Sequence, residues 1–445
     1  MAQQLITMAY IIRDLKQLAL WFVLAFFLTL AFPSCNVKTL DEDDTDNFEI
    51  EYIPVRFEKN GLWSLVSRKG EIKYQNAFKN EPTCVINGIF TIEDDNEMFT
   101  VCNINSDIPT PIKSLSNLKQ VGYINEGLLP ICYPGKRISV VNKKGVEQFV
   151  LNPINGAEIE MCSNHFSDGM LWICDENDKC GFVNTKGECV ILPIYENCGN
   201  FSEGKALVLI DSVWRVIDKS GRELFVMEKD LFPDFTNRPA CETGYEEFKY
   251  NRICVTDRDF SKPDQEYHYY MYDGQGNMTQ LSSEIKSIVD YDNTNIIYNS
   301  FSHKAGDKYF IKKDNLFDKG LITLTGEIVI NPIYETLVFL SSNELLGRNI
   351  EKPVTDEGWE IIDAAGNTIY NLNYTTTGIQ YNNIQYIPDF GLIGSIAGKS
   401  YYGGTIIQKN GKPVNADLYF EQFGTKKSPR YFTAIESCYS TSNNF

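Results

Sequence analysis

Three histidines, His165, His268 and His303, are the chain's full complement of imidazole side chains. None of them lies in a His-Glu-x-x-His zinc motif, and the chain has no Gly-x-Ser-x-Gly nucleophile turn and no Gly-x4-Gly-Lys-Ser/Thr phosphate loop. His165 precedes a phenylalanine at a junction between repeats, where a structural role is favoured over a catalytic one. The sequence therefore predicts no catalytic residue, no metal site and no cofactor.

Paired carboxylates offer a second kind of chemistry, since a glycoside hydrolase holds two of them across one cleft. Adjacent acids occur at 246–247 and 356–357, but a chain with 59 acidic residues has such neighbours by composition alone. Segments 175–178 and 290–295 alternate oxygen-bearing side chains as calcium loops do, yet they lack the glycine and the glutamate of the full motif. Turn formation is the better explanation for both segments.

The chain contains twelve cysteines but no Cys-x-x-Cys pair, so neither a zinc ribbon nor a redox motif is indicated. Four of them, Cys174, Cys180, Cys189 and Cys198, lie close together at expected strand positions. We expect free thiols that act as small buried hydrophobic side chains, with a disulfide between neighbouring repeats as the alternative in an exported chain.

The elements that position these residues recur along the chain. Phe-Ser-x-Gly occurs at 166–169 and again at 201–204, an offset of 35 residues, and such a period indicates one supersecondary unit copied in tandem. Eight tetrapeptides end in a glycine that can adopt positive φ, and most of them begin with a small polar residue, which predicts type I hairpin turns with a bulge. The eight glycines are Gly70, Gly145, Gly187, Gly221, Gly276, Gly326, Gly366 and Gly411.

Three of the five tryptophans stand seven residues before a turn glycine: Trp63, Trp214 and Trp359. Because side chains alternate along a strand, a constant offset places each indole on the same face of its hairpin. We expect these side chains to fill the core between neighbouring units. An exposed aromatic ladder for sugar stacking is the alternative.

These segments resemble the bacterial WG repeats. The family unit reads approximately Lys-Trp-Gly-aromatic-Ile-Asp-x-x-Gly, then an apolar strand ending in Pro-x-Tyr, then Phe-Ser-Glu-Gly-Leu-Ala-Val. This chain matches it best over 160–225 and 315–370, although no copy keeps the Trp-Gly pair intact. The resemblance implies an all-β repeat scaffold of bacterial envelope and secreted proteins, and it supplies no catalytic residues.

We therefore expect an all-β fold, a tandem array of antiparallel three-stranded WG-type repeats over 49–445. A propeller-like arrangement and an open curved β-ribbon both fit. The turn glycines mark eight units, and a ninth is expected around 89–112 with a turn that lacks glycine. Segments 229–266 and 290–308 are expected insertions, where a repeat protein often carries its binding surface.

The N-terminal segment predicts export. A 15-residue apolar run, Leu18–Phe32, suits a signal peptide over 1–34 and is short for a membrane span. Cys35 follows it directly and resembles the lipidated first residue of a Bacteroidetes-type lipoprotein, ahead of an acidic flexible tether over 35–48. A simple secretory peptide and an uncleaved anchor are the alternatives.

The formal charge of −18 argues against nucleic acid as a partner, because such binding depends on Lys and Arg. The function expected from the sequence is a lipid-anchored cell-envelope protein, in the outer membrane, that is attached through Cys35 and acts as a non-catalytic binding scaffold. Its partner would be a glycan or another envelope protein, and its orientation, towards the periplasm or the cell surface, is open. The alternative is a glycan- or peptide-cleaving surface lipoprotein with an acidic cleft.

Overall fold

The chain divides into two compact units, Met1–Asn47 and Phe48–Phe445. The computed structural model describes residues 50–58, 60–112, 115–228, 231–233, 248, 251–257, 268–280, 308–312, 319–323, 327–341, 343–352, 358–372, 381–387, 390–396, 403–419 and 434–436. The expected signal peptide, tether and lipidated Cys35 lie outside these residues and stay predictions. Within the described ranges, no helix has the length and hydropathy of a membrane span.

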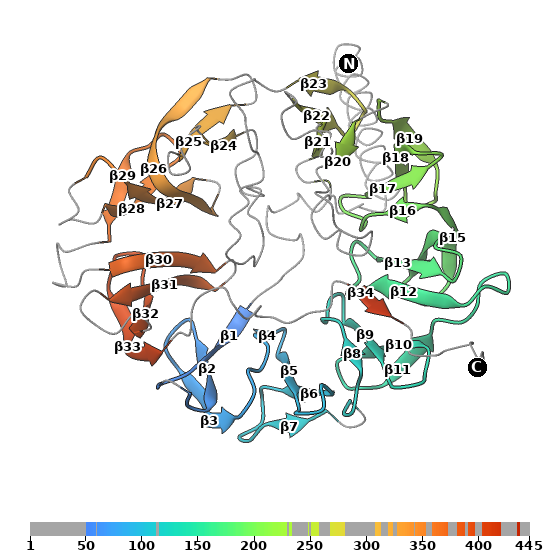
Figure 1. Cartoon of the computed structure of the whole chain (residues 1–445), viewed down its shortest axis with the longest axis horizontal. Helices are drawn as coiled ribbons and strands as arrows, with labels where there is room; N and C mark the ends of the chain where they lie inside the picture. Colours follow the sequence, from blue (N-terminus) through green and yellow to red (C-terminus); the bar gives the residue numbers. More distant parts are fainter. Residues whose placement is uncertain are drawn as a thin grey trace, which may run out of the picture. The chain divides into compact units, whose positions relative to one another are not determined.

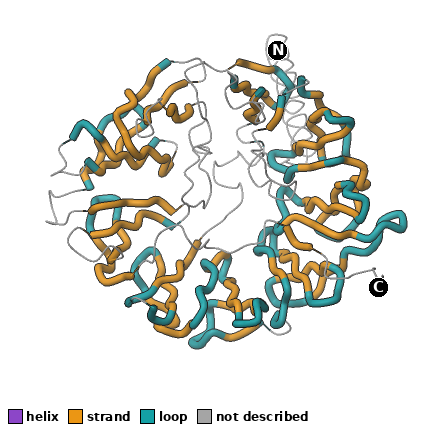
Figure 2. Tube along the Cα trace, viewed as in Figure 1, coloured by secondary structure: helices purple, strands orange, loops and turns teal. Residues whose placement is uncertain are grey.

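The described chain is strand and loop throughout (Figure 2), and its strands form seven antiparallel sheets (Figure 1). The first sheet has the order β3-β2-β1-β4-β5-β6-β7. Its strands are β1 (Ile50–Val55), β2 (Trp63–Ser67), β3 (Ile72–Phe78), β4 (Val85–Ile86), β5 (Ile89–Glu93), β6 (Phe99–Asn103) and β7 (Thr110–Pro111).

Three four-stranded sheets and one five-stranded sheet follow along the chain. The second sheet contains β8 (Gln120–Val121), β9 (Leu128–Cys132), β10 (Ile138–Asn142) and β11 (Glu147–Val150). The third contains β12 (Ile159–Ser163), β13 (Met170–Asp175), β14 (Cys180–Asn184), β15 (Cys189–Tyr195) and the C-terminal β34 (Ala434–Glu436), which pairs with β12. The fourth contains β16 (Asn197–Cys198), β17 (Lys205–Ile210), β18 (Val213–Asp218) and β19 (Glu223–Val226), and the fifth contains β20 (Phe232–Pro233), β21 (Arg252–Thr256), β22 (Tyr269–Asp273) and β23 (Met278–Gln280).

Two further sheets complete the array. The six-stranded sheet contains β24 (Lys308–Lys312), β25 (Lys319–Thr323), β26 (Ile328–Ser341), β27 (Glu344–Asn349), β28 (Trp359–Asp363) and β29 (Thr368–Asn371). The last sheet contains β30 (Tyr381–Ile387), β31 (Gly391–Ile396), β32 (Gly403–Ile407) and β33 (Pro413–Tyr419).

These seven sheets contain nine repeat units, because two sheets each join two units. Strand β1 pairs with β4 in the first sheet, and the long β26 pairs with β25 through its first half and with β27 through its second. The expected three-stranded unit is extended in several cases by a short first strand such as β16. The units are β1–β3 (unit 1), β4–β7 (unit 2), β8–β11 (unit 3), β12–β15 (unit 4), β16–β19 (unit 5), β20–β23 (unit 6), β24 to the first half of β26 (unit 7), the second half of β26 to β29 (unit 8) and β30–β33 (unit 9).

The glycine turns join the last two strands of a unit. Seven of the eight turn glycines have positive φ, between 75° and 88°, and Gly326 lies outside the described residues. In unit 2 the equivalent turn places Glu97 at φ 59°, and Asp94 stabilises it by accepting hydrogen bonds from the N–H groups of Asn96 and Met98. Asn142, Asp218 and Asp363 make the same two bonds in turns that keep their glycine, so unit 2 retains the turn with Glu97 in the glycine position.

Segment 229–266, expected as an insertion, contributes β20 and β21 of unit 6. The remaining residues of this segment that form no strand lie largely outside the described ranges, as does all of 290–308 except Lys308.

Apolar side chains between the sheets form the core, and the array closes on itself. Ile53 and Val66 of unit 1 share one buried cluster with Ile393 and Ile406 of unit 9. The first and last units are therefore neighbours, which makes the array propeller-like and excludes an open ribbon with separated ends.

The three tryptophans are buried, with exposed fractions of 6% for Trp63, 6% for Trp214 and 1% for Trp359. Trp214 packs between units 5 and 6, where its cluster includes Val255. Trp359 packs between units 8 and 9, in a cluster with Tyr381. At these positions the indoles fill the core and are not available for sugar stacking at a surface.

Candidate functional site

Two residues with catalytic potential, His165 and Asp175, serve local structure, and the partly exposed His268 has its Nδ1 3.2 Å from Asp257 Oδ2. His165 is buried, stacks on Tyr123 with ring centroids 4.2 Å apart, and its Nδ1 lies 2.6 Å from Asn164 Oδ1. Asp175 Oδ1 accepts hydrogen bonds from the N–H groups of Asn177 and Lys179, as a turn residue does. In the described part of the chain, no three His, Cys, Asp or Glu side chains are grouped to hold a metal ion.

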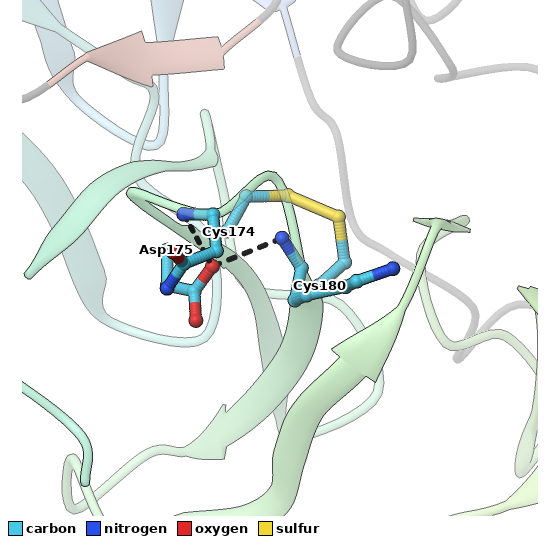
Figure 3. The surroundings of a disulfide bond; sticks show 5 residues. Cys174, Asp175 and Cys180 are labelled. Carbon is cyan, nitrogen blue, oxygen red and sulfur yellow. Dashed lines mark hydrogen bonds between the residues drawn. A yellow bond between two sulfur atoms is a disulfide. The ribbon is translucent and has the colours of Figure 1, made fainter. Parts of the chain in front are cut away.

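Cys174 and Cys180 form a disulfide across the β13–β14 hairpin (Figure 3). The two residues face each other directly in the strand register, with Cα atoms 4.1 Å apart, which is why they can pair. The expectation of free thiols is therefore wrong for these two residues, and the disulfide lies within one unit instead of between two. Cys189 and Cys198 are free.

Burial suppresses the reactivity of the buried free thiols, whereas the free Cys189 is exposed. Burial raises the pKa of Cys102 to about 12 and the pKa of Cys162 well above its ordinary value. A thiol with a raised pKa stays protonated at neutral pH and is a poor nucleophile. These cysteines therefore contribute to the core, and they are no candidates for nucleophilic catalysis.

The Phe-Ser-x-Gly motif forms a two-residue turn between the first two strands of a unit, which we call the entry turn. Its two central residues have positive φ, 54° and 78° at 168–169 and 52° and 76° at 203–204. This is the type I′ hairpin turn. The same turn occurs at 87–88 in unit 2 and at 126–127 in unit 3.

Acidic side chains join the entry turns of consecutive units. Glu126 of unit 3 accepts hydrogen bonds from Gly169 N–H of unit 4 at both carboxylate oxygens, at 2.8 and 3.0 Å. These bonds give a partner to a turn N–H that points out of its own hairpin. The arrangement recurs from unit 4 to unit 5 and from unit 5 to unit 6, with bonds of 2.5 Å from Gly204 N–H to Asp168 and 2.6 Å from Asn251 N–H to Glu203.

A second row of hydrogen bonds runs beside the first. The polar residue before each entry turn donates to the backbone carbonyl of the aromatic residue that precedes the next entry turn. We call both rows together the turn belt. The bonds of the second row are Asn125 Nδ2 to Phe166 O at 2.8 Å, Ser167 Oγ to Phe201 O at 2.7 Å and Ser202 Oγ to Phe248 O at 2.7 Å.

In the described part of the chain the turn belt links units 3 to 6, and it does not continue between units 2 and 3. Asn87 occupies the position of the acidic residue, and its Nδ2 lies 3.5 Å from Ile124 O. Ile86 occupies the position of the serine and has no polar atom in its side chain to donate. In the described part of the chain, Gly127 N–H of unit 3 has no hydrogen-bond partner.

A pocket of about 450 Å³ lies at this interruption. Its lining is mostly polar and comes from units 1, 2 and 3, which are separated along the chain. Among its lining residues, Gly127 can supply a backbone N–H donor and Lys143 a positively charged ammonium group. Glu51 can supply a carboxylate. The lining residues are Glu51, Asn87, Gly88, Asn105, Ile124, Gly127 and Lys143.

The fold and the turn belt define an all-β, propeller-like repeat protein. Within it, residues 181–214 match the family model of the WG containing repeat. The match begins in β14 of unit 4 and ends in β18 of unit 5, so one sequence repeat spans two sheets.

Several solved structures resemble this chain at low identity. The chain is 12% identical to PorZ, a surface component of the type-IX secretion system of Porphyromonas gingivalis, over 83% of this chain and 53% of that chain with a TM-score of 0.25. It is 11% identical to BamB from Moraxella catarrhalis over 79% and 98%, with a TM-score of 0.31. It is 10% identical to the computationally designed protein Ika8 over 71% and 99%, with a TM-score of 0.34. No curated protein sequence matches the chain.

Sequence reasoning missed both the turn belt and the pocket. A signal was present, because the third position of Phe-Ser-x-Gly is acidic in both copies, Asp168 and Glu203. An acidic residue repeated at a turn position that requires positive φ suggests that its side chain has a partner. That partner, however, belongs to the next unit.

Proposed function

We propose that this protein is a non-catalytic binding protein of the cell envelope and that its ligand site is the pocket between units 2 and 3. One observation carries the proposal: the belt that links units 3 to 6 does not continue between units 2 and 3, and residues from three units line a pocket there. A concave site with a few convergent polar groups is the usual form of a small-ligand site.

The character of the lining supports binding over cleavage. Glu51 is the single carboxylate among the described lining residues, whereas hydrolysis of a glycosidic bond uses two carboxylates held across one cleft. Asn87 and Asn105 provide amide groups that can both donate and accept hydrogen bonds to sugar hydroxyls. We therefore take a glycan as the first candidate ligand and an envelope protein as the second.

A glycan array probed with the purified full chain tests this function. We expect binding to a restricted set of saccharides and loss of that binding in Asn105→Trp, which places an indole in the pocket. Asn177→Trp adds the same ring to an exposed turn in unit 4 and serves as the matched control. Saccharide binding that survives Asn105→Trp would refute the pocket as the site, and an array without a bound saccharide would refute the glycan as the ligand.

We further propose that the chain is exported and anchored through Cys35. The apolar run Leu18–Phe32 immediately before this cysteine supports the proposal. Metabolic labelling with palmitate should mark the wild-type chain and leave Cys35→Ser unlabelled. Equal labelling of the two chains would contradict the anchor.

A further inference from the structure

Unit 5 shows what the donors at an entry turn bind. Asp168 of unit 4 accepts a hydrogen bond from Gly204 N–H at 2.5 Å and pairs with the Lys219 ammonium group at 2.5 Å. Lys219 is the second residue of the glycine turn 218–221 in unit 5. One carboxylate therefore bridges a backbone N–H of the entry turn and a lysine of the glycine turn.

Unit 3 carries the same two donors in the same register. Gly127 corresponds to Gly204, and Lys143 is the second residue of the glycine turn 142–145, as Lys219 is of its own turn. Both residues line the pocket. In the described part of the chain, neither Gly127 N–H nor the Lys143 ammonium group has a hydrogen-bond or ion-pair partner.

Unit 6 supports this spatial correspondence independently. There the second residue of the glycine turn is Gly274, and the entry-turn residue is Asn251. A Cβ atom added to Gly274 would lie 1.9 Å from Asn251 Oδ1. The second position of the glycine turn therefore lies next to the entry turn in this repeat, which is the geometry that brings a lysine there towards the turn N–H.

The difference between the two sites lies in the preceding unit. Unit 4 supplies the carboxylate of Asp168, whereas unit 2 supplies the neutral amide of Asn87. An amide cannot neutralise an ammonium group, and the Asn87 amide nitrogen is directed to Ile124 O. The residues that line the pocket therefore include a backbone N–H and a lysine at the two register positions that hold a carboxylate in unit 5.

We propose that the pocket binds the carboxylate of a sugar acid, such as a terminal uronic acid of a glycan, with the carboxylate bridging Gly127 N–H and Lys143. This assignment rests on the proposed function and specifies its ligand class. Charge-assisted bonds of this kind are among the strongest that a polar site can make. Glu51, Asn87 and Asn105 provide partners for the hydroxyl groups of the sugar ring.

The net charge of the chain limits the ligand further. At a formal charge of −18, the protein repels a polyanion, so the glycan would carry an isolated acidic residue. The lining also favours a sugar over the C-terminus of a peptide, because Ile124 is the single large apolar side chain among the lining residues that the structure describes.

Calorimetry on the full chain tests the proposal with a disaccharide that ends in glucuronic acid and with its methyl ester. The ester keeps the hydroxyl groups and removes the charge, so its affinity should be lower by about tenfold or more, the equivalent of one charge-assisted bond. Lys143→Met should weaken binding of the acid by a similar factor. Lys144→Met removes the neighbouring exposed lysine of the same turn and should bind as the wild type does.

Asn87→Asp is the most specific variant, because it introduces the carboxylate that unit 4 supplies naturally. We expect it to abolish binding of the acid while the thermal midpoint stays equal or rises. An unchanged or higher midpoint shows that binding is lost because the new carboxylate occupies the two donors, and not because the protein misfolds. The converse variant, Asp168→Asn, should create a second acid-binding site at Gly204 and Lys219.

Four outcomes would overturn the proposal. Equal affinity for the acid and its ester would exclude the carboxylate contact, as would unchanged acid binding in Asn87→Asp. Binding of free peptide C-termini without binding of sugar acids would reassign the site to peptides. Neutral saccharides that bind the wild type and Asn87→Asp alike, but not Asn105→Trp, would leave the proposed function standing and reject the carboxylate assignment alone.

Discussion

Units 3 and 4 have the same backbone plan and different connections to their neighbours. Their equivalent residues are 42 positions apart, as Gly127 and Gly169 or Cys132 and Cys174 are. The entry turn of unit 4 is held by Glu126 of the preceding unit, and its β13–β14 hairpin is cross-linked by a disulfide. The entry turn of unit 3 faces a pocket, and the residue opposite Cys132 is Ile138.

This comparison shows that the residues that determine the fold of a repeat differ from those that form the proposed binding site. The order and pairing of the four strands and the two kinds of turn are the same in both units, so the backbone plan does not depend on the turn belt. The difference comes from a few side-chain positions, above all Asn87 in place of an acid. With an acid at this position the entry turns of two units are hydrogen-bonded, and with Asn87 a pocket lies between them. If the proposed site binds its ligand, this repeat array acquired a binding site by omitting internal bonds, without any new element.

The largest expected effect concerns the aromatic position of the motif. Phe166 is fully buried beside Phe149, and Phe166→Ala should lower the free energy of unfolding by about 3–5 kcal/mol through lost burial and the cavity left behind. Ile124 holds the same position in unit 3 and lines the pocket, so Ile124→Ala should cost about 2 kcal/mol, at the low end of its range. Urea unfolding of both variants measures the difference. A larger loss of stability in Ile124→Ala than in Phe166→Ala would contradict a pocket beside Ile124.

The disulfide gives the next largest effect. Replacing Cys174 and Cys180 together by serine should lower the free energy of unfolding by about 2 kcal/mol, because the cross-link closes a short loop and restricts the unfolded chain. A reducing agent should lower the stability of the wild type and leave the double variant unchanged. An identical response of the two proteins would show that the cross-link does not form in solution.

The Asp168 carboxylate of the turn belt is expected to contribute less to the free energy of unfolding than the disulfide does. Asp168→Asn should lower the free energy of unfolding by about 1 kcal/mol, since its partner Lys219 is partly exposed and solvent screens the pair. Adding Lys219→Met to this variant should cost little more, and the double-mutant cycle isolates their coupling. Independent, additive losses would show that the two side chains do not act together.

The smallest effect concerns pH and the first residue of the glycine turn. A hydrogen bond from the Ser220 hydroxyl, with further bonds from the N–H groups of Ser220 and Arg222, lowers the pKa of Asp218 from 3.8 to about 2. Because the folded value is the lower one, this stabilisation is present above about pH 4 and is lost as the pH falls towards about 2. Unit 3 has the neutral Asn142 at this position.

We therefore expect Asp218→Asn to reduce the fall of the thermal midpoint between about pH 4 and pH 2. Asn142→Asp should increase that fall, since it adds a titrating group to the matching turn of unit 3. Parallel curves for the wild type and both variants would show that these turns do not contribute to acid unfolding.

Much of the fold could be predicted from the sequence because its determinants are local. A glycine at the fourth position of a turn, such as Gly187 or Gly221, specifies a hairpin through its own φ, and the flanking β-branched residues specify strands. The offset of the tryptophans likewise indicated a common buried position. The same reasoning could not find the disulfide, because the strand register that places Cys174 opposite Cys180 depends on how the turn between them closes.

The candidate site depended on contacts between units. Glu126 and Gly169 are 43 residues apart, and the lining residues Glu51 and Lys143 come from units 1 and 3. A periodic sequence shows that units repeat, but it does not show which atoms of one unit meet the next. The boundary of the sheets was hidden for the same reason, since the matched repeat at 181–214 crosses from one sheet into another.

The sequence alone determined that this chain folds as serial antiparallel hairpins, because turn and strand preferences act over a few neighbouring residues. Only the tertiary structure decided that the first unit packs against the last, that acids link the entry turns of units 3 to 6 and that this link is absent between units 2 and 3. Those features depend on distances between residues that are remote along the chain, and burial and hydrogen bonding across the sheets set these distances.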